Sequence, residues 1–254
     1  MSSVTIRFYE ELNDFLPENR RKQPSGVEFA PGCTAKAIIE DMGVPHTEVD
    51  LILANGRSVG FEYRLGDGDL LSVFPVFESL DIGAVSRVRA IPLREPRFAL
   101  DVHLGKLARL LRMCGFDAQY ENDSSDEILV SIARCEKRII LTRDRGLLKR
   151  RTVTHGFLLR SLVPREQLAE VLRRFDLWGR VRMFSMCIVC NVPIERVDKA
   201  AVMTLLPPVV AAAYTNFSRC ARCGRVYWRG THWESMKRLA AEILGGAPDG
   251  QLIG

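Results

Sequence analysis

Hydrophobic and polar residues alternate along the front of the chain in short stretches that are typical of β-strands. In Val4-Thr5-Ile6-Arg7-Phe8, for example, alternate residues are apolar, which indicates a strand with one buried face. Thr34 and Gly43 bound a stretch with helical spacing, as its N-cap and its stop. Asn55-Gly56 favours a tight hairpin turn. The pattern predicts strands at 4–8, 27–29, 51–53 and 70–74 and a helix at 34–42, which is the order of a β-grasp fold.

From Arg97 onward, short apolar strands alternate with amphipathic helices. Leu104, Leu107, Leu110 and Leu111 fall on one face of the first of these helices. Strands that alternate with helices pair in parallel through right-handed crossovers, so we expect a parallel sheet. The predicted strands are 98–102, 117–120 and 138–142, and the predicted helices are 104–115, 124–136, 164–178 and 197–206, the last stopped by Pro207-Pro208.

The composition is that of a folded protein in a reducing compartment. The 254 residues are 47% hydrophobic, which suits one large domain or two ordinary ones. Cys33, Cys114 and Cys135 stand singly and are expected to be free thiols. The first residues do not resemble a leader peptide, and no apolar run is long enough to cross a membrane. We expect a cytoplasmic protein without a membrane partner, and the sequence carries no signal for an oligomeric state.

Charge is divided unevenly along the chain. Residues 1–93 hold 9 Lys or Arg and 14 Asp or Glu, a net charge of −5, whereas residues 94–254 hold 27 and 17, a net charge of +10. An acidic front and a basic rear indicate two domains with different partners. The basic runs at 137–138, 143–145 and 149–151 suit a polyanion, although each run alone equally fits a solvated surface.

Two Cys-x-x-Cys pairs near the C-terminal end are the strongest chemical signal. Cys187 and Cys190 form the first pair, and Cys220 and Cys223 form the second. Two thiolate pairs complete a tetrahedral site for structural zinc, and Gly224 allows the backbone to double back beneath the metal. The gap between the pairs exceeds the roughly 15–20 residues of common ribbons. We predict a four-thiolate zinc site, because the alternative of four unrelated buried cysteines does not explain the paired spacing.

Aromatic and basic residues follow the second pair and suit nucleic acid. Tyr227, Trp228 and Trp233 can stack on unpaired bases. The cations that can meet phosphates are Arg225, Arg229 and Lys237. Alternatively, these rings do not stack on bases but form a small hydrophobic core around the zinc. His232 could replace a thiolate, but four cysteines already fill a tetrahedral site.

Four aspartates lie where the predicted parallel sheet places its working edge. Asp101 and Asp144 each follow an expected strand, and Asp123 and Asp126 lie at the start of the helix expected at 124–136. Carboxylates gathered at one edge need a hard cation, and Mg²⁺ or Mn²⁺ is the natural choice. Both acids at the start of this helix also have a structural explanation in place of metal binding. Asp126 lies in the first turn, where an acid interacts favourably with the helix dipole, and Glu127 fits a capping box.

Cations near these acids are candidates for holding substrate phosphates. They are Lys106, Arg143 and Arg145. Lys106 equally fits the exposed face of an amphipathic helix. His103 is a weaker candidate for a general base, because metal-bound water needs none. His46 and His155 show no partners in the sequence and are expected to be structural.

The front segment resembles a family of small ubiquitin-like proteins. Leu51-Ile52-Leu53-Ala54-Asn55-Gly56 and Gly66-Asp67-Gly68-Asp69 are similar to the sulfur carriers of thiamine and molybdopterin synthesis. Those carriers end in a free Gly-Gly whose carboxylate is activated, whereas this chain continues beyond Pro75 without such a terminus. The resemblance therefore implies a domain that docks a protein partner, and it argues against sulfur transfer.

The rest of the chain resembles the Mut-seven C-terminal RNase domain family of PIN-like nucleases. The residues that carry the resemblance are 98–109, 141–148, both cysteine pairs and 225–233, so it spans roughly 95–240. It implies a PIN-like α/β/α fold, metal-dependent RNA cleavage, and an acidic site with Asp101, Asp126 and Asp144. It also implies a β-grasp domain in front. Serines stand within 121–126 where family members often have further acids, which leaves the number of metals open.

Together these patterns predict a metal-dependent ribonuclease that hydrolyses RNA phosphodiester bonds at an acidic Mg²⁺ or Mn²⁺ site, with a zinc ribbon that aids substrate binding. The alternative is a non-catalytic RNA-binding or adaptor protein whose β-grasp domain recruits a partner. The expected organisation is a β-grasp domain at 1–82, a nuclease domain at 95–180, a zinc ribbon at 181–240 and a disordered tail at 245–254.

Overall fold

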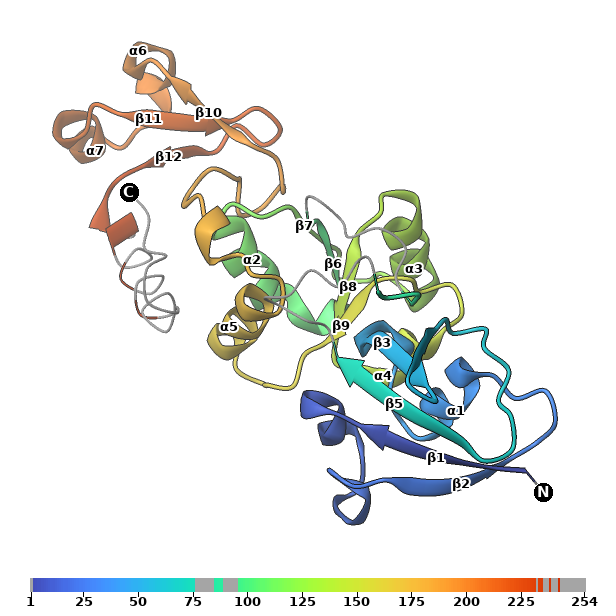
Figure 1. Cartoon of the computed structure of the whole chain (residues 1–254). Coiled ribbons are helices and arrows are strands. Elements are labelled where there is room, and N and C mark those ends of the chain that lie inside the picture. Colours follow the sequence, from blue (N-terminus) through green and yellow to red (C-terminus); the bar gives the residue numbers. More distant parts are fainter. Residues whose placement is uncertain are drawn as a thin grey trace. The chain divides into compact units, whose positions relative to one another are not determined.

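The computed structural model describes residues 2–75, 85–88 and 96–231, together with Trp233, Glu234, Arg238 and Glu242 (Figure 1). The expected tail at 245–254, His232 and Lys237 lie outside these residues. The chain forms two compact units, which are Met1–Glu95 with Ala133–Leu158 and Pro96–Ile132 with Leu159–Gly254. The first unit thus combines the front of the chain with a segment from the middle of the expected nuclease region. The domain boundaries stay a prediction.

A mixed five-stranded sheet and one helix form the front of the first unit. β1 (Ser2–Phe8) pairs in parallel with β5 (Asp69–Pro75), and the other neighbouring strands are antiparallel. The helix α1 (Ala35–Asp41) buries Ile38 and Ile39. This arrangement confirms the predicted β-grasp fold, although the pattern does not predict the three-residue strand β4. The strands are β1 (Ser2–Phe8), β2 (Ser25–Phe29), β3 (Val49–Ala54), β4 (Arg57–Val59) and β5 (Asp69–Pro75), in the order β2-β1-β5-β3-β4.

Local signals set the ends of these elements. The Thr34 hydroxyl oxygen accepts a hydrogen bond from the Ala37 N–H at 3.3 Å, as expected for an N-cap. Asn55 and Gly56 have φ angles of 51° and 78°, the positive values that a type I′ hairpin turn requires. Short 3₁₀ helices lie at Glu10–Phe15, Glu18–Arg20, His46–Glu48, Val102–Leu104, Trp178–Arg180 and Met203–Leu205.

A segment from the middle of the chain completes the first unit. β8 (Ile139–Thr142) pairs in parallel with β9 (Gly156–Leu158), and α4 (Arg145–Lys149) lies between them in sequence. Hydrogen bonds connect this segment to the β-grasp elements: His46 Nε2 with the Val153 carbonyl (2.8 Å), Lys149 Nζ to the Glu40 carbonyl (2.7 Å), and the Leu158 N–H to Glu48 Oε1 (2.9 Å). The β-grasp elements and the segment that carries Asp144 therefore pack as one compact unit.

The second unit contains a parallel strand pair and two helices that pack against each other. β6 (Phe98–Leu100) pairs in parallel with β7 (Ala118–Tyr120), and α2 (Gly105–Met113) packs against α5 (Pro164–Arg174). α3 (Asp126–Cys135) follows β7. Leu110, expected on the buried face of α2, is only half-buried. The pairing of β6 with β7 and of β8 with β9 confirms the predicted parallel strands. Buried side chains of this unit include Phe98, Leu107, Leu111, Leu168 and Leu172.

An antiparallel three-stranded sheet forms the C-terminal part of the second unit (Figure 1). The helix predicted at 197–206 is confirmed in part, since α6 (Lys199–Val202) and the 3₁₀ helix Met203–Leu205 lie within it, but Val197 ends a strand by pairing with Phe217. Pro208 begins a separate helix as its first residue. The elements are β10 (Ile194–Val197), α6 (Lys199–Val202), α7 (Pro208–Ala213), β11 (Phe217–Cys220) and β12 (Val226–Trp228). None of the helices in the described part of the chain has the length and apolar character needed to cross a membrane.

Candidate zinc centre, aspartates and basic groove

The two Cys-x-x-Cys turns have the same backbone structure. In the first, the Cys187 N–H donates to the Val192 carbonyl at 2.8 Å, and the Cys187 carbonyl accepts from the Asn191 N–H at 3.0 Å. The second turn repeats both hydrogen bonds from Cys220, at 3.0 Å and 2.9 Å. Each turn reverses at a residue with positive φ, 56° at Asn191 and 71° at Gly224. The chain therefore presents each thiol pair from a single tight loop.

The four thiols converge on one point. The Sγ atoms of the two pairs lie within 4.8 Å of one another, and those of Cys187 and Cys223 are 3.9 Å apart. Zn–S bonds of about 2.3 Å in a tetrahedron place the sulfurs about 3.8 Å apart, so this spacing fits a zinc ion. Thiolates are also ligands that zinc prefers. The cluster can hold one zinc ion, and four protein ligands leave no open position on it. Its members are Cys187, Cys190, Cys220 and Cys223.

Tyr227 hydrogen-bonds one thiol of this cluster. The Tyr227 hydroxyl lies 3.1 Å from Cys187 Sγ and donates to its thiolate. Burial raises the pKa of the Cys187 thiol, but the hydrogen bonds from Tyr227 and from the N–H groups of Cys190 and Val189 outweigh burial and lower this pKa to about 6. Burial and the hydrogen bonds to neighbouring thiols raise the pKa of Cys190 to about 12. Cys187 is therefore the thiol of this pair that is prepared as a thiolate, the form that binds metal.

A buried arginine ties the first cysteine turn to the helical core. Arg112 of α2 is 5% exposed, and its guanidinium donates to the carbonyl oxygens of Ala118 (2.9 Å), Ile188 (3.1 Å) and Val189 (2.9 Å). Asn191 adds a second link, because its Oδ1 accepts a hydrogen bond from the Ala118 N–H at 2.8 Å. The first turn is thus positioned by α2 and β7 as well as by its sulfur atoms.

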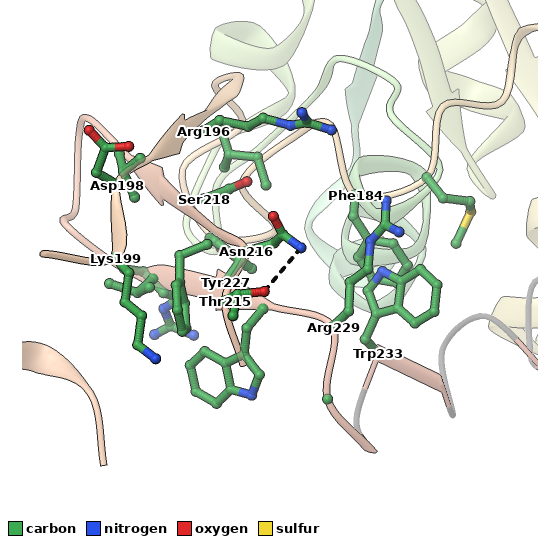
Figure 2. A pocket seen from close by; sticks show the side chains of 18 of the residues that line it. Phe184, Arg196, Asp198, Lys199, Thr215, Asn216, Ser218, Tyr227, Arg229 and Trp233 are labelled. Atoms are coloured by element: carbon green, nitrogen blue, oxygen red, sulfur yellow. Dashed lines mark hydrogen bonds between the residues drawn. The ribbon is translucent and has the colours of Figure 1, made fainter. Parts of the chain in front are cut away.

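Five of the residues predicted to bind substrate near the second turn line one groove. This groove has a volume of about 900 Å³ and lies against the three-stranded sheet (Figure 2). The structure thus brings together side chains that the sequence places within nine positions. They are Arg225, Tyr227, Trp228, Arg229 and Trp233.

The aromatic rings of this groove also have structural contacts. Trp228 packs against a small buried core that contains Phe217. The Trp233 ring centroid lies 5.5 Å from that of Phe184 and 5.3 Å from Cζ of Arg229. The alternative of a small core therefore holds for part of the aromatic surface, and it does not exclude contact with a ligand.

The aspartates of the second unit lie near the ends of its strands. Asp101 directly follows β6 and is half-buried, and the Tyr120 hydroxyl lies 2.8 Å from the Val102 carbonyl oxygen beside it. Asp123 is exposed, and Asp126 is half-buried in the first turn of α3. Within the described ranges, these three carboxylates do not form a close group of possible metal ligands, whereas the cysteines do. The acidic metal site stays a prediction.

Asp144 lies in the first unit, directly before α4. Its Oδ1 accepts a hydrogen bond from the Gly146 N–H at 2.7 Å, so Asp144 is the N-cap of α4. The side chain is exposed, and a carboxylate with one oxygen in a cap can still offer the other to a cation. The sequence pattern alone does not predict this capping role.

The cations predicted to hold phosphates have different surroundings. Lys106 and Arg143 are exposed. The Arg145 guanidinium lies over the Phe15 ring, with Cζ 5.2 Å from the ring centroid, so part of its surface packs on the β-grasp domain. Phosphate binding by these residues stays a prediction.

Two family models match the chain. The Mut7-C RNAse domain model matches residues 96–240, more than half of the chain. The chain belongs to the Mut7-C RNAse domain family. The Mut7-C ubiquitin model matches residues 1–81, in front of that domain. Both resemblances seen in the sequence, a ubiquitin-like front and an RNase domain behind it, are confirmed. No curated protein matches the chain.

Two solved structures of small proteins are similar to part of this Mut7-C chain. One is a Pyrococcus furiosus protein classed as a molybdopterin converting factor, subunit 1, with 19% sequence identity and a TM-score of 0.24. The other is small archaeal modifier protein 1 of H. volcanii, with 14% identity and a TM-score of 0.24. Each similarity covers 30% of the Mut7-C chain and 98% of the small protein.

Two residues that position the four-cysteine cluster of this Mut7-C protein are not predicted from the sequence. Arg112 stands one turn after Ala108 on the buried face of α2, where a cation among apolar residues signals a buried partner. Asn191 follows its cysteine pair at the position that Gly224 holds after the second pair. Because Asn tolerates positive φ better than most residues, this match between the pairs is a usable signal.

Proposed function

We propose that this chain is a divalent-metal-dependent ribonuclease that hydrolyses RNA phosphodiester bonds at an acidic site. The observation that carries the proposal is membership of the Mut7-C RNAse domain family. The positions of two aspartates support it, because Asp101 directly follows β6 and Asp144 lies just beyond β8. Both strands belong to parallel pairs, and ligands of such sheets bind beyond the carboxyl ends of the strands.

The proposed ligands of Mg²⁺ or Mn²⁺ share hard carboxylate oxygens and partial or full exposure to water. Both properties suit ions that keep several waters in their coordination shell. An ion held by these carboxylates would supply positive charge that orients an attacking water and offsets charge on the leaving oxygen. The ligands are Asp101, Asp123, Asp126 and Asp144, and the side chains proposed to hold the flanking phosphates are Lys106, Arg143 and Arg145.

We further propose that the zinc centre is structural and that the ribbon binds RNA. Four thiolates fill the tetrahedral shell, so the centre offers no position at which water could be activated. The ribbon instead fixes β12, which carries Tyr227 and Trp228 of the groove and is directly flanked by Arg225 and Arg229. Its contribution to cleavage is therefore expected in substrate affinity and not in the chemical step.

Cleavage of mixed cellular RNA with Mg²⁺ or Mn²⁺, followed by mapping of the ends, tests the nuclease proposal. Asp101→Asn and Asp144→Asn keep the size of the side chain but remove its charge, and each should slow cleavage by roughly 100-fold or more. Asp176→Asn is the matched control, because Asp176 is exposed and its φ of 46° is accepted by Asn. The control should cleave RNA like the wild type.

A wild-type protein that binds RNA but cuts none with either metal would contradict the proposed ribonuclease activity. That result would favour the alternative, a non-catalytic RNA-binding or adaptor protein whose ubiquitin-like domain recruits a partner. If the two aspartate variants lose cleavage but keep the RNA affinity of the wild type, the acidic residues act in the chemistry and the binding surface lies elsewhere.

A further inference from the structure

The helix that follows the proposed metal ligand Asp144 is too short to hold its own position. α4 has five residues, and an isolated helix of this length is not stable in water. Asp144 is its N-cap, with Oδ1 accepting from the Gly146 N–H at 2.7 Å, so the carboxylate moves with the first turn of α4. The contacts that fix α4 therefore also fix the direction of this carboxylate.

Strands β8 and β9 hold one side of α4. Leu147 and Leu148 are buried, and α4 packs against both strands. The backbone before the helix is also held, because the Asp144 N–H donates to the Thr142 hydroxyl oxygen of β8 at 2.9 Å. Apolar packing is not directional, so the buried leucines fix the depth of α4 on the strands but not the position of its two ends.

The β-grasp elements hold both ends of α4. At the first turn, the Arg145 guanidinium lies over the Phe15 ring, with Cζ 5.2 Å from the ring centroid. At the last turn, Lys149 Nζ donates to the Glu40 carbonyl of α1 at 2.7 Å. Both kinds of contact depend on direction, so they set the orientation that the apolar side leaves open.

His46 of the β-grasp elements fixes the loop behind α4. Its ring is buried, with Nε2 2.8 Å from the Val153 carbonyl oxygen and Nδ1 2.6 Å from Glu40 Oε1. A carbonyl oxygen only accepts, so Nε2 donates to Val153. Two turns connect this point to the helix, because the Val153 N–H donates to the Arg150 carbonyl and the Arg150 N–H donates to the Leu147 carbonyl. The ring of His46 therefore restrains the C-terminal end of α4 through the backbone.

We propose that the β-grasp domain positions Asp144 through α4, with His46 and Lys149 as positioning residues, so that metal-dependent cleavage requires this domain in the same chain. The inference rests on the proposed function, which makes Asp144 a metal ligand. It gives the domain a role inside the nuclease, in addition to the docking of a partner. A displacement of about 1 Å at a reacting site can slow the chemical step roughly 100-fold, so small shifts of α4 are expected to matter.

Amide hydrogen exchange at Gly146 in the full-length chain tests the positioning independently of cleavage. This N–H donates to Asp144 Oδ1, so its protection reports whether α4 holds the carboxylate. His46→Leu removes both hydrogen bonds of the ring and should accelerate the exchange roughly 5- to 150-fold. Lys149→Met removes one partly exposed donor and should accelerate it roughly 2- to 10-fold. His46→Gln keeps a donor for the Val153 carbonyl and should stay within about 3-fold of the wild type.

Cleavage kinetics test whether this position matters for the reaction. His46→Leu should lower kcat roughly 10- to 100-fold, and Lys149→Met roughly 2- to 10-fold, with an unchanged KM for RNA. Both variants should need more Mn²⁺ for half-maximal cleavage. A smaller folded fraction lowers kcat without changing that Mn²⁺ concentration, so this readout separates positioning from stability. If His46→Leu does not fold, Lys149→Met alone decides the test.

The control is Arg64→Met, which removes an exposed cation of the same domain and should match the wild type in every measurement. Exchange at Gly146 that stays at the control rate in both variants would overturn the inference, as would an unchanged Mn²⁺ requirement. A raised KM with an unchanged kcat would also overturn it and would make Lys149 a contact to RNA. A wild-type chain that cuts no RNA contradicts the nuclease proposal instead, and exchange at Gly146 then still shows whether the β-grasp domain positions Asp144.

Discussion

Replacing Arg112 with methionine tests whether the core of the second unit positions the zinc centre. The Arg112 guanidinium donates to the Ala118, Ile188 and Val189 carbonyls, and methionine fills a similar volume without a donor. The first cysteine turn then loses its link to α2, while all four thiols remain. We expect a less stable protein that releases zinc faster.

The expected loss in the free energy of unfolding depends on how exposed the three carbonyl groups are to water. Ala118 is fully buried, so its carbonyl loses a charge-assisted hydrogen bond worth about 1.5–3 kcal/mol. Ile188 is half-buried and Val189 is exposed, so water replaces part of what their carbonyls lose. Burial lowers the pKa of Arg112, which indicates a desolvation cost that methionine relieves. The net destabilisation is therefore about 2–4 kcal/mol, or roughly 4–16 °C in melting temperature.

The assay combines thermal unfolding with the rate of zinc release to a chromogenic chelator. Arg109→Met is the control, because Arg109 is exposed on the same helix. The free energy of unfolding of the control should lie within about 0.5 kcal/mol of the wild-type value. If Arg112→Met melts and releases zinc like the control, the hydrogen bonds of Arg112 do not position the cysteine turn and the reasoning fails.

Three further predictions concern the packing of each unit and the thiol cluster. Glu48→Ala leaves the Leu158 N–H without its hydrogen-bond acceptor, which lies 2.9 Å away in the wild type. Amide hydrogen exchange at Leu158 should therefore accelerate roughly 5- to 150-fold. The control Glu28→Ala, at the exposed glutamate of β2, should leave this exchange rate unchanged. Burial raises the pKa of the Cys187 thiol, but its hydrogen bonds outweigh burial and lower this pKa to about 6, so Cys187 loses its proton before Cys190 as the pH rises. Tyr227→Phe removes a donor to that thiolate and raises its pKa, so zinc should dissociate at a higher pH in an acid titration followed by a zinc indicator. Gly115→Ala should cost about 2–4 kcal/mol in denaturant unfolding, because φ is 91° there and a methyl group would meet the Arg182 carbonyl.

Each of these predictions can fail in a specific way. Unchanged exchange at Leu158 would mean that Glu48 does not hold β9 to the β-grasp elements. An unchanged pH of zinc release in Tyr227→Phe would mean that the hydroxyl does not tune Cys187 in the metal-bound protein. A Gly115→Ala chain as stable as the wild type would mean that the turn after α2 can shift away from Arg182 at little cost.

Elements with a local signal are predicted well from the sequence. Thr34 caps α1, Asn55-Gly56 makes the hairpin turn, and Pro164 begins α5, because each acts on backbone within a few residues of itself. The helix predicted at 197–206 starts too early for the opposite reason, because the structure is helical only from Lys199. The pairing of Val197 with Phe217 depends on a residue twenty positions away, and it overrides the helical pattern at Val197.

The sequence by itself determines the β-grasp order, the alternation of strands and helices, and the four thiols of the candidate zinc centre. Periodicity and spacing encode all three within short stretches of chain. Only the tertiary structure decides what holds these parts in place: Arg112 reaches carbonyls 76 and 77 residues away, and Glu48 accepts from an N–H 110 residues away. A buried polar group must find a partner wherever the fold places one, and no local pattern records which distant residue that will be.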